Sequence, residues 1–127
     1  MNSTKPLVSI LLPVHNCDHH LADCLKSLVS QNYRQIEIIA IDDFSTDNSL
    51  KILKSFAKKY PSTSSGRGKK GRVYKNIKRY GIVMTLNRLL RRAKGDYIAF
   101  MDANDISAKL RIKKQLEFLM DNQGVVA

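Results

Sequence analysis

The sequence predicts an α/β fold, a mostly parallel sheet with helices on both faces. Two observations carry this prediction: short apolar runs alternate with segments of helical periodicity, and these runs lack the alternation typical of half-exposed strands. The length of 127 residues fits one domain, and 43% hydrophobic and 26% charged residues exclude a disordered chain. No apolar run reaches the roughly 18 residues of a membrane span, and the start lacks the features of a signal peptide, so we expect a cytoplasmic protein.

The first half of the chain is predicted to fold as strand, helix, strand and helix. The apolar run 8–12 stops at Pro13, and a second run covers 36–41. Between them, a helix from 18 to about 31 places one set of apolar side chains on a single face: Leu21, Cys24, Leu25, Leu28 and Val29. A second helix is expected to be capped by Ser45 or Thr46 and to end at Pro61.

The second half is predicted to begin with a mobile basic loop at 62–71, which has no apolar residue and three glycines. A short strand at 72–75 is expected next, and a buried strand at 97–101. A helix from about 81 to 95 is expected to turn these residues inward: Ile82, Leu86, Leu89, Leu90 and Ala93. The last helix, from about Ser107 to Gln123 and Gly124, is expected to bury Ile112, Leu116, Leu119 and Met120.

Positive charge is concentrated in the middle of the chain. Residues 1–50 carry a net charge of −3 within a total of +11, and the stretch 51–94 contains fifteen Lys or Arg and no Asp or Glu. This stretch favours an anionic partner, namely nucleic acid, an anionic membrane or a phosphorylated small molecule, or else forms solvated helix faces. Tyr60, Tyr74 and Tyr80 could stack on bases, but no nucleic-acid-binding motif accompanies them, so specific nucleic-acid binding is not expected.

Acidic and polar residues follow three of the predicted strands. His15 and Asn16, Asp42 and Asp43, and the segment 102–105 should meet at one sheet edge, because ligands of parallel sheets bind outside the carboxyl ends of the strands. Converging carboxylates repel one another unless a cation joins them. Oxygen ligands from Asp102, Asn104 and Asp105 suit Mg²⁺ or Mn²⁺, although Asp and Asn after a strand are also ordinary turn residues.

The cysteines and histidines indicate neither a disulfide nor a zinc site. Cys17 and Cys24 are seven residues apart near one helix, so we expect no disulfide. The group His15, Cys17, Asp18, His19 and His20 fits no zinc-ligand spacing.

Three blocks of the chain together resemble the nucleotide-binding half of family 2 glycosyltransferases. They are VSILLPVHN at 8–16, IDDFSTDNS at 41–49 and AKGDYIAFMDAND at 93–105. The resemblance covers nearly the whole chain and implies a GT-A fold, a Rossmann-like three-layer sandwich. It also implies a donor that is a nucleotide-diphosphate sugar, such as a UDP-sugar, and inverting transfer to a hydroxyl of a saccharide or lipid-linked acceptor.

The resemblance also implies roles for individual residues. Pro13, Val14, His15 and Asn16 would form the wall around the base and ribose, and Asp43 would accept a hydrogen bond from the imide of a uracil. Arg79 would contact the nucleotide. Asp102 would hold the ribose or the metal, and Asn104 and Asp105 would coordinate the Mg²⁺ or Mn²⁺ that bridges the diphosphate.

The chain departs from the family pattern at several positions. Phe44 stands where the family has Gly, His15 where it has Tyr, Asn104 where it has Asp, and Lys109 where it has Pro. The loss of one carboxylate at Asn104 should weaken cation binding. The segment 62–71 resembles an insertion.

No residue of the chain can be assigned as the general base, which in this family comes from the acceptor-binding half. Glu117 and Asp121 lie on the last helix, and the chain ends where Gly124 begins what resembles a further strand. We therefore expect a truncated donor-binding domain, with residues 1–127 inactive alone. We also expect an unpaired sheet edge that favours self-association, and peripheral contact with the inner face of an anionic membrane. The alternative is a non-catalytic basic module that binds nucleic acid or an anionic membrane.

Overall fold

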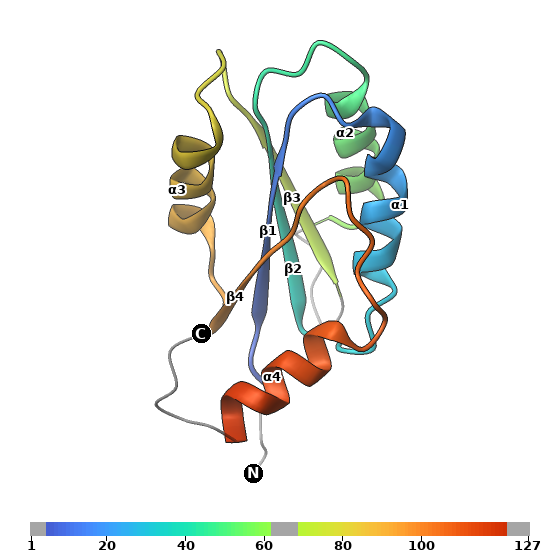
Figure 1. The fold of residues 1–127 in the computed structure, drawn as a ribbon, viewed down its shortest axis with the longest axis vertical. Helices are drawn as coiled ribbons and strands as arrows, with labels where there is room; N and C mark the ends of the chain where they lie inside the picture. The colour runs from blue at the N-terminus through green and yellow to red at the C-terminus, as the bar shows by residue number, and fades with distance from the viewer. Residues whose placement is uncertain (1–4, 62–68, 122–127) are drawn as a thin grey trace.

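The computed structural model describes residues 5–61 and 69–121 as an α/β fold around a four-stranded sheet (Figure 1). The elements in chain order are β1 (Val8–Val14), α1 (Asp18–Val29), β2 (Ile36–Asp42), α2 (Ser49–Lys59), β3 (Lys70–Lys75), α3 (Ile82–Arg92), β4 (Tyr97–Phe100) and α4 (Arg111–Asp121). The strand order is β3-β2-β1-β4, and every strand pair is parallel. The predicted fold class and element order are confirmed.

The sheet lies between two helical layers, with α1, α2 and α4 on one face and α3 on the other (Figure 1). β1 and β2 are central and buried on both faces, which explains why their sequences are continuously apolar. The larger core joins alternate residues of these strands, such as Ile10 and Ile38, to Leu21 and Leu28 of α1. The smaller core, under α3, contains Leu11, Ile39, Ile41 and Leu89.

A buried polar network fixes the amino-terminal end of the sheet beneath α3. Glu37 of β2 forms an ion pair with Arg72 of β3, at 3.0 Å from its Oε1 to Nη2 of the arginine. The other carboxylate oxygen of Glu37 accepts hydrogen bonds from the Ser9 hydroxyl at 2.5 Å and from the Lys94 backbone N–H at 2.7 Å. Arg72 also donates to the carbonyl of Arg92, so the network ties the end of α3 to the sheet.

The strand β3 begins earlier than the sequence predicts. Lys70 and Gly71, expected in the basic loop, pair with Glu37 and Ile38 of β2, whereas residues 62–68 of that loop lie outside the described residues. A Cβ at Gly71 would lie 2.5 Å from the Phe56 ring, so the glycine lets β3 pass close under α2.

Two helices begin later than predicted. In the segments before them, backbone N–H and carbonyl groups form hydrogen bonds with side chains of other segments rather than within the helix. α2 begins at Ser49 after Asn48, and Ser45 and Thr46 bond instead to Asn16 of the neighbouring loop. α4 begins at Arg111. The segment before it is held to α1 by two side chains: the Gln31 amide donates to the Ser107 hydroxyl and the Ala108 carbonyl, and the Ser107 N–H donates to the Ser27 hydroxyl.

The prediction that 97–101 is a fully buried strand is wrong. β4 is an edge strand with one face covered, and Ile98 and Phe100 are exposed on the face that carries α3. α3 packs over β1 and β2 rather than over β4, so Ile82 and Leu90, which were expected to face inward, are exposed as well. Met120 of α4 is also exposed, and Gln123 and Gly124 lie outside the described residues. Among residues 5–61 and 69–121, no helix is long and apolar enough to span a membrane.

Candidate nucleotide-sugar site

The carboxyl ends of β1 and β2 and the connection between β3 and α3 surround a hollow of about 120 Å³. We call it the Asp43 hollow; it is lined by Pro13, Val14, His15, Asp43, Arg79, Ile82 and Thr85. Five of these residues were predicted to bind the donor nucleotide: Pro13, Val14, His15, Asp43 and Arg79. The sheet therefore brings them together from three separate parts of the sequence, as expected for the carboxyl edge of a parallel sheet.

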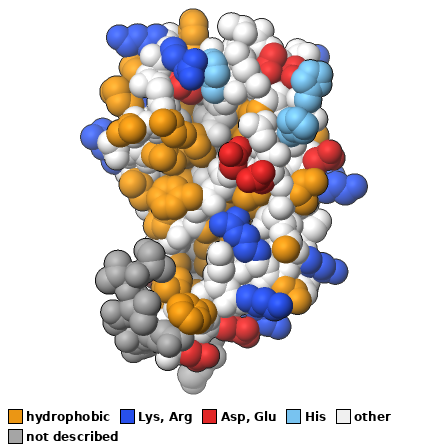
Figure 2. Space-filling model, viewed as in Figure 1, with side chains coloured by type: hydrophobic (Ala, Val, Ile, Leu, Met, Phe, Trp, Pro, Cys, Tyr) orange, Lys and Arg blue, Asp and Glu red, His pale blue; other side chains and the backbone are white. Residues whose placement is uncertain are grey.

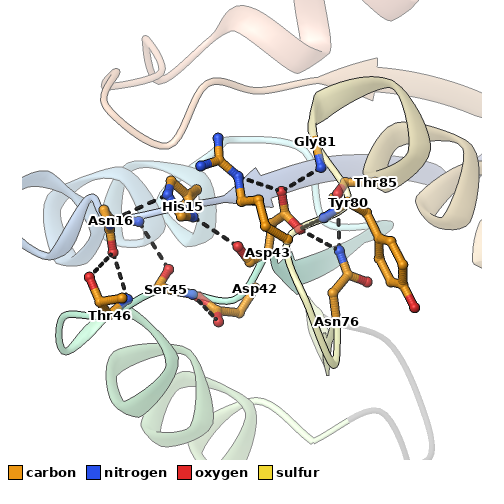
Figure 3. A network of polar contacts seen from close by, with 11 residues as sticks. His15, Asn16, Asp42, Asp43, Ser45, Thr46, Asn76, Tyr80, Gly81 and Thr85 are labelled. Atoms are coloured by element: carbon orange, nitrogen blue, oxygen red, sulfur yellow. Dashed lines mark hydrogen bonds and ion pairs between the residues drawn. The ribbon is translucent and has the colours of Figure 1, made fainter.

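The carboxylate of Asp43 is the centre of this hollow and accepts four hydrogen bonds (Figure 3). One oxygen accepts from the Asn76 amide at 2.9 Å and the Tyr80 N–H at 2.8 Å. The other accepts from Arg79 Nε at 3.1 Å and the Gly81 N–H at 3.0 Å. A carboxylate has about four lone-pair positions, so all of its accepting capacity is used within the chain.

These contacts set the charge of the Asp43 hollow. The Asp43 side chain is only 6% exposed, and this burial alone would raise its pKa. The hydrogen bonds from Tyr80, Asn76, Gly81 and Arg79 outweigh burial and hold the pKa of Asp43 below its ordinary value. Arg79 remains 59% exposed, so its guanidinium is held by the carboxylate and still faces solvent.

His15 and Asn16 connect the loop after β1 to the loop after β2. His15 Nδ1 lies 2.8 Å from the carbonyl oxygen of Asp43. Asn16 has a positive φ of 48°, its N–H donates to the Ser45 hydroxyl, and its side-chain oxygen accepts from the Thr46 N–H (Figure 3). Asn16 is not among the residues that line the Asp43 hollow, so its predicted contact with the nucleotide stays a prediction.

A second, wider hollow of about 490 Å³ adjoins the first. We call it the Asp102 hollow; it is lined by Pro13, Ile82, Leu86, Phe100, Met101, Asp102 and Asp105. Pro13 and Ile82 line both hollows, so the two are direct neighbours. Figure 2 shows acidic side chains beside an apolar surface on this face. The exposed faces of β4 and α3 form this apolar surface.

The donor set at the Asp102 hollow fits a hard divalent cation. Asp102 and Asp105 would supply carboxylate oxygens, which suit Mg²⁺ or Mn²⁺ with positions left for phosphate and water, whereas Asn104 is not among the residues that line the hollow, so its predicted role as a ligand stays a prediction. One oxygen of Asp102 accepts the Asn104 N–H at 2.9 Å, so the segment is also a tight turn. In the described part of the chain, no group of three or more His, Cys, Asp or Glu side chains lies close enough together to hold a metal ion. The His and Cys side chains around His19 and His20 therefore form no such group either.

Three residues that were not predicted from the sequence donate hydrogen bonds to Asp43. The Asn76 amide bridges Asp43 and the Thr85 hydroxyl, and the backbone of Tyr80 and Gly81 donates to Asp43. A polar residue directly after a strand at the carboxyl edge is the signal that could have identified Asn76.

The two cysteines take no part in this chemistry. Cys17 and Cys24 are buried and free, and burial raises the pKa of Cys24 to about 12, so its thiol stays protonated. The Cys24 thiol lies 3.7 Å from the Asp102 carbonyl and packs beneath the acidic segment.

Comparison with known proteins identifies relatives of this chain. The sequence pattern of the family described as glycosyl transferase family 2 matches residues 9–127. The putative glycosyltransferase EpsE of Bacillus subtilis is 40% identical over 94% of this chain and 40% of its own length. The poly(ribitol-phosphate) beta-glucosyltransferase of Bacillus spizizenii is 33% identical over 92% of this chain and 18% of its own. The chain thus spans less than half the length of these relatives.

Solved structures show the same fold. The mannosyltransferase PcManGT of Pyrobaculum calidifontis, in complex with GDP-Man and Mn²⁺, has a TM-score of 0.80 at 22% identity, covering 92% of this chain and 33% of its own. S. aureus TarS 1-349, in complex with UDP-GlcNAc, has a TM-score of 0.78 at 21% identity, covering 95% and 36%. Both likenesses concern the fold, which is that of GT-A glycosyltransferases. With the family pattern matched over all but its first eight residues, the chain belongs to glycosyl transferase family 2.

Proposed function

We propose that this chain binds a nucleoside-diphosphate sugar, a UDP-sugar in the first place, as the donor for glycosyl transfer. The observation that carries the proposal is the pair of adjoining hollows: Asp43 and Arg79 line one, Asp102 and Asp105 line the other, and Pro13 lines both. The nucleoside would occupy the Asp43 hollow and the diphosphate and sugar the Asp102 hollow. UDP-sugar and GDP-sugar complexes with the same fold support the nucleotide class.

The Asp43 carboxylate already accepts four hydrogen bonds, and this limits how it could bind the base of the nucleotide. A uracil imide can bond to Asp43 only if one of the four donors leaves, and Arg79 is the one on a half-exposed side chain. The other three donors come from buried Asn76 and from the backbone. We therefore propose that Arg79 turns from Asp43 toward the nucleotide when the donor binds, which frees an acceptor for the imide and brings a cation to the phosphates.

The acidic segment would hold a cation that stabilises the leaving group. Glycosyl transfer releases a nucleoside diphosphate on which negative charge grows, and a divalent cation held by Asp102 and Asp105, with Asn104 beside them, would supply electrostatic stabilisation of that charge. Asp102 and Asp105 line this hollow together with the apolar side chains of Ile82, Leu86 and Phe100.

The transfer step itself needs an acceptor and a general base. Glu117 and Asp121 lie on α4, which crosses the end of the sheet opposite the two hollows, so neither is placed to deprotonate an acceptor there (Figure 1). Inverting transfer to a saccharide or lipid-linked hydroxyl is proposed for the whole protein, and a longer relative that is a poly(ribitol-phosphate) beta-glucosyltransferase supports glycosyl transfer as the reaction class.

Titration calorimetry of the chain with UDP, with and without Mn²⁺, tests the proposal. We expect Mn²⁺-dependent binding. Asp105→Ala should abolish the increase in UDP affinity that Mn²⁺ causes. Arg79→Ala should lower the affinity for UDP about tenfold or more, since a hydrogen bond to a charged group contributes about 1.5–3 kcal/mol. Asp121→Ala, the same loss of charge on α4, is the matched control and should leave the affinity unchanged. A folded chain that does not bind UDP, or variants that all bind equally, would contradict the site.

A further inference from the structure

Two large apolar side chains project into solvent at the end of the molecule that carries the Asp43 hollow. Phe44, in the loop between β2 and α2, is 52% exposed, and Ile77, in the loop between β3 and α3, is 78% exposed. The residues before them are bonded to each other, since Asn76 donates its backbone N–H to Asp42 at 2.8 Å and its amide to Asp43. The two loops therefore lie side by side, at the top of Figure 1.

Phe44 is exposed at a cost to its backbone. Its φ is +59°, a left-handed conformation that is costly for a bulky residue and that glycine adopts freely. A strained aromatic residue that packs poorly against its own chain contributes little to folding, so a role for the exposed ring itself is the physical reason to retain it.

Exposed lysines lie in and beside the two loops that carry these side chains. Lys75, at the end of β3, and Lys78, next to Ile77, are both exposed, and Lys78 Nζ lies 5.7 Å from the centre of the Tyr80 ring. Asp42, opposite Lys75 in the strand register, is buried and accepts the Ser45 N–H, and the neighbouring Asp43 binds Arg79. Apolar side chains beside exposed lysines match the interface of an anionic bilayer, where rings enter the headgroup layer and lysines contact phosphates.

Nucleic acid, the other anionic partner, fits this surface less well. Single-stranded nucleic acid needs free aromatic faces on which bases stack. Tyr60, Tyr74 and Tyr80 are each only partly exposed, and each has a cation over its ring, with Arg92 3.8 Å from the centroid of Tyr74.

We propose that the loop tip formed by Phe44, Ile77, Lys75 and Lys78 docks the protein on an anionic lipid surface. The Asp43 hollow opens at the same end of the sheet, so docking would hold a bound donor next to the bilayer. Docking does not require nucleotide, and none of these four residues lines the Asp43 hollow.

Sedimentation with vesicles tests the loop tip. Vesicles of phosphatidylcholine alone are compared with vesicles in which phosphatidylglycerol replaces about a third of the lipid, at about 0.1 M and 0.5 M salt. We expect binding to the anionic vesicles only, weakened by salt. Lys75→Ala with Lys78→Ala should lower partitioning roughly 25-fold, at about 1 kcal/mol per lysine. The matched control, Lys113→Ala with Lys114→Ala, removes the same charge from α4 and should change binding far less.

The apolar part of the loop tip is tested by Phe44→Gly with Ile77→Ser. This pair should lower vesicle binding about tenfold or more, while the thermal midpoint and UDP titration show that the variant is folded. The proposal is overturned if the lysine double variant and the Phe44→Gly, Ile77→Ser variant bind anionic vesicles as well as the α4 control does. So does binding to a single-stranded oligonucleotide that competes with vesicles and is indifferent to Phe44 and Ile77. Failure of UDP binding with intact vesicle binding would contradict the donor site alone.

Discussion

Removal of Arg72 from its ion pair with Glu37 should destabilise the fold strongly, although neither residue belongs to the site. The Glu37 side chain is 8% exposed, and Arg72 Nη2 is 3.0 Å from its Oε1. Arg72→Met keeps most of the apolar stem and leaves a buried carboxylate without its counter-ion. Breaking a buried pair in this way costs about 3–5 kcal/mol. Glu37 retains the donors Ser9 and Lys94, so we expect the lower end, about 3 kcal/mol.

Urea unfolding monitored by circular dichroism measures this cost. With a slope of about 2 kcal/mol/M, a loss of about 3 kcal/mol lowers the midpoint by about 1.5 M. Glu37→Gln in the Arg72→Met background removes the unpaired charge and should recover at least about 1 kcal/mol. Lys113→Met, on the exposed surface of α4, should stay within about 0.5 kcal/mol of the native chain. A cost below about 1 kcal/mol for Arg72→Met, or no recovery in the double variant, would refute the reasoning.

Three further predictions concern single positions. Phe44→Gly should raise the free energy of unfolding by up to about 1 kcal/mol in urea melts, because glycine tolerates the positive φ, whereas Phe44→Ala should give no such gain. Gly95→Ala should cost about 3 kcal/mol or more in the same assay, because a Cβ there would lie 2.7 Å from the backbone nitrogen of Ser9. Asp43→Asn should destabilise the chain most at neutral pH. The lowered pKa of Asp43 means that its contribution is present above about pH 4 and is lost as the pH falls through the folded-state pKa, so the difference from the native chain should shrink in melts near pH 3.

The central part of the fold could be predicted because local pattern and tertiary environment agree there. β1 and β2 are buried on both faces, and their unbroken apolar sequences indicate this directly. β4 has a similarly apolar sequence but lies at an edge, and nothing local distinguishes the two cases. The late start of α4 depends on Gln31, which is 76 residues from its partner Ser107, and a local pattern cannot reveal such a contact.

The rule that ligands bind at the carboxyl ends of parallel strands predicted which residues share one edge of the sheet. It places His15, Asp43 and Asp102 there, whereas Arg79 was implied only by the family resemblance, and it says nothing of which side chains bond to one another. The saturation of Asp43 depends on Asn76 and on two backbone N–H groups, and backbone donors leave no trace in a residue pattern.

Glu37 of β2 and Asp43, directly after β2, hold α3 at its two ends. Asp43 accepts the N–H groups of Tyr80 and Gly81 where α3 begins, and Glu37 accepts the N–H of Lys94 after it ends. α3 buries few side chains of its own, so these hydrogen bonds carry much of its attachment, and Ile82 of α3 lines both hollows. Loss of UDP binding in an Asp43 variant would therefore mix a lost contact with a displaced helix. Arg79→Ala leaves both backbone hydrogen bonds in place, so it keeps α3 attached, and the change in UDP affinity reports the contact of Arg79 with the nucleotide less the ion pair that Arg79 forms with Asp43 in the free chain.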